Sequence, residues 1–193
     1  MNAFPPPQRL LVVRRRYLGD IVLLDPLLRA LRGAFPTLYL ALLVDEGYEG
    51  VLAHHAALDR IFALPKKGFF SPLRTGLDLR QVGFDACLNL SPGNRTGFVT
   101  RLAGIKRRIG FRTEGDSARD GLNEPLVRPA SFFREHPILD LYSSLLAPLG
   151  VSRPAESDPD RPLRFPILDD ARREAAERLG RAFPCSCRPL VVI

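Results

Sequence analysis

Gly19 and Asp20 are the residues of this chain whose types and position best suit chemistry. They follow an apolar-to-basic run over Leu10–Arg16, which predicts a strand, and precede apolar residues at helical spacing over Ile21–Phe35. The pair is therefore expected at the carboxyl end of a strand, the edge of an open α/β sheet where ligands bind. A glycine there would let the backbone turn tightly. An aspartate beside a helix N-terminus is favoured as the charged carboxylate, which could act as a general base or hold a substrate hydroxyl.

Two points about this segment stay open at the level of the sequence. Asp20 could simply cap the helix that follows it. Asp25 followed by Pro26 is also a good helix start. The main helix then begins at Pro26 and leaves Asp20 in a shorter preceding turn, or Pro26 kinks one continuous helix.

The elements that would position this pair alternate between strand and helix. Strands are expected over Leu10–Arg16, Leu38–Val44, Arg60–Leu64, Phe84–Leu90 and Arg107–Phe111, with helices over Ile21–Phe35, Gly47–His55, Pro72–Val82 and Asn94–Ile105. The run Leu38–Val44 is almost continuously apolar, as expected of a strand buried on both faces of a parallel sheet. The alternation predicts an α/β layer fold with right-handed crossovers.

The rest of the chain predicts a loop, a helix, a linker and the start of a second unit. Thr113–Glu135 is expected to be a long loop, and His136–Leu149 a helix closed by Gly150. Ser152–Pro162 is rich in Pro and Asp and predicts a linker. A helix over Asp169–Phe183 and an apolar strand over Arg188–Ile193 follow, and we expect the sequence to be cut one strand into a second domain. The expected division is a domain over 1–151, a linker over 152–168 and the start of a second domain over 169–193.

Composition and charge narrow the class of protein. The 193 residues carry a formal net charge of +7, and 25 of the 28 cationic side chains are arginines. Arginine favours bidentate contacts with phosphate and carboxylate groups, although a coding preference would produce the same excess. No zinc finger, aromatic RNP pair or KH loop is recognisable, so nucleic acid is not expected as a partner. No apolar run approaches the roughly 18 residues that span a bilayer, and none forms a signal-peptide core, so a cytoplasmic protein is expected.

The other candidate sites carry weaker signals. His54 and His55 lie near Asp59, but no third ligand is apparent, so no metal site is expected. Cys185 and Cys187 lack the spacing of redox or zinc motifs, and three cysteines in all are too few for a disulfide framework. The absence of a G-x-G-x-x-G fingerprint argues against an NAD-dependent dehydrogenase. No cofactor is expected.

Four blocks of the sequence resemble glycosyltransferase family 9, the ADP-heptose:lipopolysaccharide heptosyltransferases. The blocks occur in the family's order over Leu11–Leu31, Leu42–Leu52, Phe84–Phe111 and His136–Val151. The resemblance implies a GT-B arrangement, in which two Rossmann-like domains with parallel sheets and flanking helices face each other across a cleft. Residues 1–151 would then be the N-terminal, acceptor-side domain. Residues 169–193 would begin the nucleotide-sugar domain.

The resemblance also implies roles for particular residues. Asp20 matches the Gly-Asp carboxylate that serves the family as catalytic base and removes the proton of the acceptor hydroxyl, with inversion at the anomeric centre. We expect the acceptor to be bound by Gly19, Arg95, Arg107 and Arg108. The guanidinium groups of the three arginines suit the Kdo carboxylates and phosphates of the acceptor. For each arginine, an ordinary solvated surface role is the alternative.

The implied reaction transfers heptose from ADP-heptose, the nucleotide-sugar donor, to a lipid-linked saccharide, with no metal or cofactor. The reaction would take place at the cytoplasmic face of the inner membrane, where a basic surface of the protein would favour peripheral contact with anionic lipid. The donor site belongs to the second domain, of which the chain has only the start, so the chain alone is expected to be inactive. The alternative is a non-catalytic α/β module that binds a phosphorylated saccharide or a protein partner.

Overall fold

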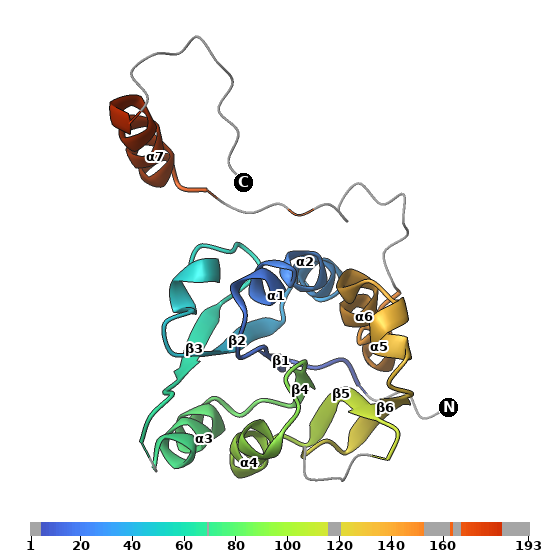
Figure 1. The fold of residues 1–193 in the computed structure, drawn as a ribbon. Helices are drawn as coiled ribbons and strands as arrows, with labels where there is room; N and C mark the ends of the chain where they lie inside the picture. The colour runs from blue at the N-terminus through green and yellow to red at the C-terminus, as the bar shows by residue number, and fades with distance from the viewer. Residues whose placement is uncertain (1–4, 69, 116–120, 153–162, 164–166, 183–193) are drawn as a thin grey trace.

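Six parallel strands form one sheet in the order β3-β2-β1-β4-β5-β6 (Figure 1). The computed structural model describes residues 5–68, 70–115, 121–152, 163 and 167–182. The strands are β1 (Arg9–Val13), β2 (Tyr39–Asp45), β3 (Arg60–Leu64), β4 (Ala86–Asn89), β5 (Arg107–Thr113) and β6 (Glu124–Arg128). From β1 the strands are added toward one edge up to β3, and from β4 they are added toward the other edge up to β6. This strand order is that of the dinucleotide-binding Rossmann folds. The predicted parallel α/β fold is confirmed.

Helices cover both faces of the sheet (Figure 1). One face carries α1 (Leu18–Val22), α2 (Asp25–Ala34), α5 (Phe132–Glu135) and α6 (Ile138–Ser144), and the other carries α3 (Ser71–Val82) and α4 (Asn94–Leu102). Alternate residues of β1 belong to two cores, with Leu10 and Val12 in the α2–α6 core and Leu11 and Val13 in the α3–α4 core. Successive strand side chains point to opposite faces, so a strand covered on both sides must be apolar throughout.

The segment Thr113–Glu135, predicted to be a loop, also contains strand β6 and the short helix α5. The prediction was wrong because β6, one of the two edge strands of the sheet, has no fully buried residue. It therefore lacks the continuous apolar run that marks the central strands, and its second residue is Pro125, a residue that sheets tolerate at an edge.

Two predicted helices are shorter than expected. Gly47–His55 contains only the 3₁₀ turn η1 (Glu49–Leu52). His136–Leu149 divides into α6 and the 3₁₀ turn η3 (Ala147–Leu149), where Pro148 has no N–H for a helical hydrogen bond. Gly150 ends η3 in the left-handed conformation, as the sequence predicted.

The structure answers the question raised by Pro26. Helix α1 ends at Val22, and α2 begins at Asp25 with Leu24 as its N-cap residue. Pro26 therefore lies in the first turn of α2, where a missing N–H costs nothing. Asp20 belongs to the separate short helix α1.

His55 belongs to a buried ionic cluster with Asp25 and Arg29. The His55 Nε2 atom lies 3.0 Å from Asp25 Oδ1, and the Arg29 guanidinium donates two hydrogen bonds of 3.0 Å to the same carboxylate. Asp25 and His55 are both buried. The cluster ties the start of α2 to the segment after η1, so the packing of the fold accounts for His55.

Cys87 lies fully buried in β4, and this burial raises the pKa of its thiol to about 12. The nearby Arg108 lowers the pKa, but by less than burial raises it. The thiol is therefore protonated at neutral pH and behaves as a small apolar side chain. Cys185 and Cys187 lie outside the described residues.

The predicted C-terminal helix is present as α7 (Asp169–Ala182) and is exposed along its whole length. Most of the predicted linker and the strand expected at 188–193 lie outside the described residues. The division into two domains stays a prediction. Among the residues that the structure describes, no helix is long and apolar enough to cross a membrane.

Candidate active site at the carboxyl edge of the sheet

The carboxyl ends of β1 and β4 lie side by side where the connections diverge. After β1 the chain turns to α1 and α2 on one face, and after β4 it turns to α4 on the other face (Figure 1). The Leu90 N–H donates a 2.9 Å hydrogen bond to the Val13 carbonyl, which holds the two strand ends together. Such a switch point opens a crevice that binds ligands in α/β sheets.

Asp20 is held at this crevice by Arg14. One guanidinium nitrogen of Arg14 donates to Asp20 Oδ2, and the other donates a 2.7 Å hydrogen bond to the Leu90 carbonyl. The Asp20 side chain is 22% exposed, and within the described part of the chain its Oδ1 atom has no hydrogen-bond partner. Asp20 is the third residue of α1, whose N-cap residue is Tyr17, so the helix-capping alternative is wrong. One carboxylate oxygen is fixed and the other is available.

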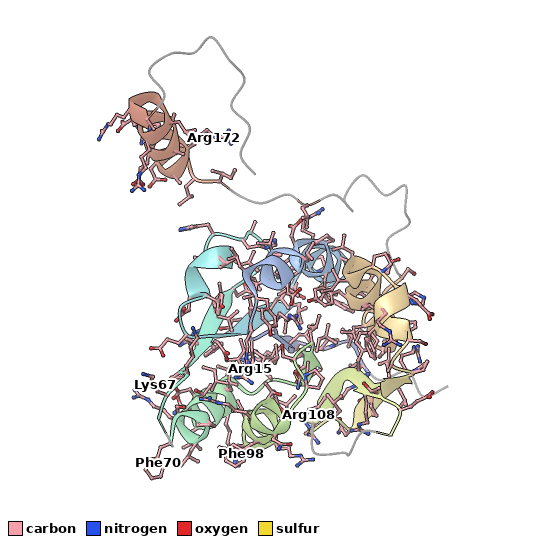
Figure 2. All side chains as sticks on the ribbon, viewed as in Figure 1. Arg15, Lys67, Phe70, Phe98, Arg108 and Arg172 are labelled. Carbon is pink, nitrogen blue, oxygen red and sulfur yellow. The ribbon has the colours of Figure 1, made fainter. Side chains whose placement is uncertain are left out.

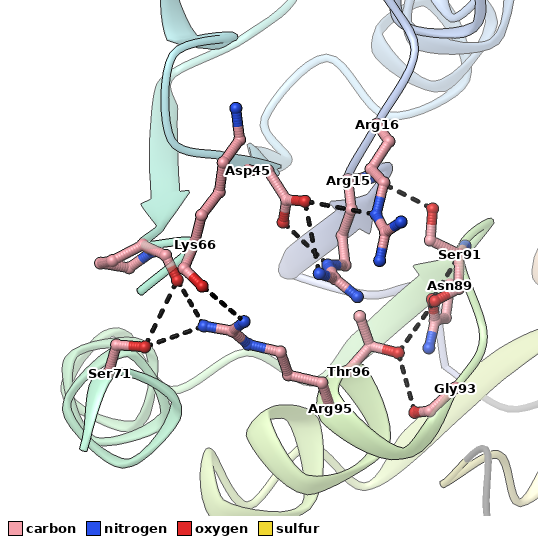
Figure 3. A network of polar contacts seen from close by, with 11 residues as sticks. Arg15, Arg16, Asp45, Lys66, Ser71, Asn89, Ser91, Gly93, Arg95 and Thr96 are labelled. Atoms are coloured by element: carbon pink, nitrogen blue, oxygen red, sulfur yellow. Dashed lines mark hydrogen bonds and ion pairs between the residues drawn. The ribbon is translucent and has the colours of Figure 1, made fainter. Parts of the chain in front are cut away.

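Arg15 makes a second ion pair beside the first (Figure 3). Its guanidinium donates two hydrogen bonds, of 2.8 and 3.3 Å, to the buried carboxylate of Asp45 at the end of β2. Its backbone N–H donates to Ser91 Oγ at 3.1 Å, and the neighbouring Arg16 approaches Asp45 at 3.6 Å. Two acidic side chains thus face three consecutive arginines, which leaves one excess positive charge.

These arginines border a cavity of about 200 Å³. The residues that line it are Arg14, Arg15, Arg16, Tyr17, Ser91 and Pro92. Arg16 is the most exposed of the three, with 60% of its side chain accessible. An exposed guanidinium at the rim of a polar cavity suits a carboxylate or phosphate of an incoming ligand.

The sharp turn of this loop falls at Tyr17, not at Gly19. Tyr17 has a φ of 66°, which is uncommon for a residue with a side chain and costs about 1–3 kcal/mol. Gly19 lies within α1 outside the left-handed region, and a Cβ atom added there would meet nothing within 4 Å. The expectation that Gly19 provides the turn was therefore wrong. The space beside Gly19 is open, and its predicted contact with the acceptor stays a prediction.

Tyr142 joins the site from α6, far along the chain. Its ring centroid lies 5.8 Å from the Arg14 guanidinium carbon, and its hydroxyl is buried without a hydrogen-bond partner in the described part of the chain. Burial raises the pKa of Tyr142 well above its ordinary value; the Arg14 charge lowers it and the Asp20 charge raises it. The hydroxyl therefore stays protonated and can donate a hydrogen bond. In the sequence Tyr142 is one member of an apolar helical stripe, and nothing there distinguishes it from a core residue.

Replacing Tyr142 with Phe is expected to raise the free energy of unfolding by about 1 kcal/mol at pH 7, because a buried hydroxyl without a partner is removed. The folded state holds the hydroxyl proton more tightly than the unfolded state, so wild type should lose stability above pH 10. The variant should lack this part of the loss. Urea unfolding of wild type and variant at pH 7 and above pH 10 measures these differences in stability. Tyr39→Phe is the control, because Tyr39 is partly exposed. A destabilised Phe variant would mean that the hydroxyl has a partner.

Arg95 lies at the same edge of the sheet, but its guanidinium is occupied by protein (Figure 3). It donates to the Pro65 and Lys66 carbonyls and, at 2.8 Å, to Ser71 Oγ. These contacts fasten the loop between β3 and α3 to the start of α4. Arg95 therefore positions that loop. Its predicted contact with the acceptor stays a prediction.

Arg107 and Arg108 do not join this site. They begin β5, and the register pairs Arg107 with Ala86 at the start of β4, at the edge of the sheet opposite to Asp20. Arg107 binds both carboxylate oxygens of Glu124 at 2.8 Å, and Arg108 donates to the Gly121 carbonyl at 2.6 Å. The structure therefore does not bring the two arginines together with Asp20, as the shared acceptor site required. Their contacts serve the β5–β6 edge.

Comparisons with known proteins point to one group. The lipopolysaccharide heptosyltransferase 1 of Campylobacter coli is 27% identical over 105 residues, which cover 53% of this chain and 30% of that protein. The structure of a glycosyl transferase family 9 protein from Veillonella parvula matches with a TM-score of 0.74 and 21% identity, covering 93% of this chain and 51% of that one. E. coli ADP-heptose lps heptosyltransferase II gives a TM-score of 0.65 at 20% identity, over 94% of this chain and 52% of the other. No family model matches the sequence.

These findings confirm the resemblance to glycosyltransferase family 9 and the Rossmann-like fold that it implies. E. coli heptosyltransferase WaaC, solved with ADP, matches in the same way, with a TM-score of 0.62 over 79% of this chain. The chain spans about half the length of these solved structures. The fold matched here is thus that of one half of these structures.

Proposed function

We propose that this chain is the acceptor-side half of an inverting glycosyltransferase that moves heptose from ADP-heptose to a lipid-linked saccharide. The observation that carries the proposal is the state of Asp20, whose Oδ2 is held by Arg14 while its Oδ1 is partnerless within the described chain and partly open to solvent. A general base needs this combination of fixed orientation and one accessible oxygen. The position of Asp20 at the switch point of the sheet agrees with it.

In the proposed reaction, the acceptor hydroxyl oxygen attacks the anomeric carbon of the heptose from the face opposite ADP. A new carbon–oxygen bond forms while the bond to the ADP phosphate breaks, and the electron pair leaves with the phosphate oxygen. The hydroxyl proton passes to Asp20 Oδ1. Attack from the opposite face inverts the configuration at the anomeric carbon.

The neighbouring residues would orient the acceptor. Arg14 fixes Asp20 and is a positioning residue, and the Tyr142 ring lies beside the Arg14 guanidinium. Arg16 at the rim of the cavity is suited to an acceptor carboxylate or phosphate. The donor would bind the second half of the two-domain protein. Because the acceptor is lipid-linked, we further propose a peripheral contact with the cytoplasmic face of the inner membrane.

The test uses this chain and a two-half chimera, in which residues 1–151 replace the matching half of E. coli WaaC. We expect both proteins to bind a soluble Kdo saccharide, measured by calorimetry, and only the chimera to release ADP from ADP-heptose in its presence. A neutral hexose glycoside serves as the control ligand. Failure of both proteins to bind the Kdo saccharide would overturn the proposal. Binding without transfer by a folded chimera would favour the non-catalytic module.

A further inference from the structure

The outer face of α3 and α4 carries exposed apolar side chains. Phe70, Leu73 and Leu77 follow one another at spacings of three and four residues, so they share one side of α3. Phe98 is exposed on α4, and Phe70 and Phe98 both point away from the sheet (Figure 2). The exposed fractions of these two phenylalanines are 70% and 49%. We call these four residues the outer apolar stripe.

The two helices hold the stripe together. A Cβ atom on Gly76 of α3 would lie only 2.7 Å from Leu102 of α4, so the helices are in close contact there. Phe98 lies one turn before Leu102 on α4. The opposite sides of the helices already fill the core, for example with Leu79 and Val99. The stripe is therefore additional apolar surface that this part of the fold does not bury.

The segment that carries the stripe is rich in basic residues. Residues 66–106 contain seven Lys and Arg side chains but only two acidic ones, Asp78 and Asp85, so five of the seven net positive charges of the chain lie in this segment. The exposed basic side chains of this segment form what we call the basic border, and they are Lys66, Lys67, Arg74, Arg80, Arg101 and Lys106. Of the two acidic residues, Asp85 lies after α3 and accepts hydrogen bonds from the backbone N–H groups of Gln8 and Arg9. Asp78 lies on α3 itself.

We infer that the outer apolar stripe and its basic border bind the surface of an anionic lipid membrane. Aromatic and aliphatic side chains that enter the interface, ringed by basic residues that meet anionic headgroups, are the pattern of interfacial membrane binding. Protein-binding surfaces are depleted of lysine, whereas three of the six exposed basic side chains here are lysines. The inference rests on the proposed function in one respect, since a lipid-linked acceptor gives this contact its purpose.

The position of the stripe relative to the site supports the same inference. Helices α3 and α4 begin at the carboxyl edge of the sheet, so Phe70 and the loop with Lys66 and Lys67 lie at the edge that also carries Asp20. Arg95 fastens this loop to the start of α4. A membrane against the stripe would therefore lie beside the crevice that we propose for the acceptor.

The test measures cosedimentation of this chain with phosphatidylcholine vesicles, with and without phosphatidylglycerol. We expect binding only to the anionic vesicles. Arg74→Gln with Arg80→Gln should lower the partition coefficient about 25-fold, since each basic side chain near an anionic surface contributes a factor of about five. Phe70→Ser with Phe98→Ser should lower it by about the same factor, at unchanged salt dependence.

The matched control removes the same charge from another exposed helix, by Arg172→Gln with Arg173→Gln on α7. An equal loss in this control, or no binding of wild type to anionic vesicles, would overturn the inference. Thermal unfolding checks that all variants are folded. Binding of the soluble Kdo saccharide is measured in parallel. The stripe variants should keep it, so failure of the membrane inference is distinguishable from failure of the proposed function.

Discussion

Asp20→Asn in the two-half chimera is expected to lower the turnover number of heptosyl transfer by about 10³-fold, within the range that general-base catalysis contributes. The amide can still accept a hydrogen bond from Arg14, so the side chain should keep its place. It can no longer take the proton of the acceptor hydroxyl. The dissociation constant of the acceptor should therefore change little, and the loss should appear in the turnover number.

ADP release and calorimetric titration of the Kdo saccharide measure the two quantities separately. Asp78→Asn is the control, because it makes the same change at an exposed carboxylate on α3 and should leave both quantities unaltered. If the turnover number of the Asp20 variant stayed within a fewfold of wild type, Asp20 would not be the base. A loss of acceptor binding of the same size would instead identify Asp20 as a binding residue.

Asp25→Ala is expected to lower the free energy of unfolding of this chain by about 3 kcal/mol or more, a large part of the stability of an ordinary domain. The Asp25 carboxylate is 1% exposed and accepts two hydrogen bonds from Arg29. It also lies 3.0 Å from the buried His55 ring. Its removal would take away the acceptor that the Arg29 guanidinium and the buried His55 nitrogen share.

Urea unfolding measures this loss, and Asp59→Ala is the matched control. Asp59 also accepts hydrogen bonds of 2.7 Å, from Arg32 and from the Leu40 N–H, but its side chain is 38% exposed, so its removal should cost about 1–2 kcal/mol. The double variant Asp25→Ala with His55→Ala should lose less than the sum of the two single losses, because the two residues share one interaction. Equal losses for Asp25→Ala and Asp59→Ala would contradict the role of the buried cluster.

The predicted strands show what a local pattern can and cannot reveal. Strands β1, β2 and β4 were predicted correctly because burial on both faces requires nearly continuous apolar sequence, which can be read without knowing the neighbours. An edge position does not by itself hide a strand, because β3 at the other edge carries an apolar run and was predicted correctly. Strand β6 was missed because none of its residues is fully buried and it includes Glu124, Pro125 and Arg128. Its composition is then indistinguishable from that of a loop.

The sequence by itself determined the alternation of strands and helices, and the position of Asp20 after the first strand. Only the tertiary structure decided the surroundings of that carboxylate. Arg14, Asp20 and Tyr142 meet because the order of strands and the return of α6 across the sheet bring them together. The parallel register also places Arg107, which the sequence grouped with Asp20, at the opposite edge. Apolar periodicity reports burial residue by residue, whereas a site depends on which strand ends share an edge, and that follows from packing over the whole chain.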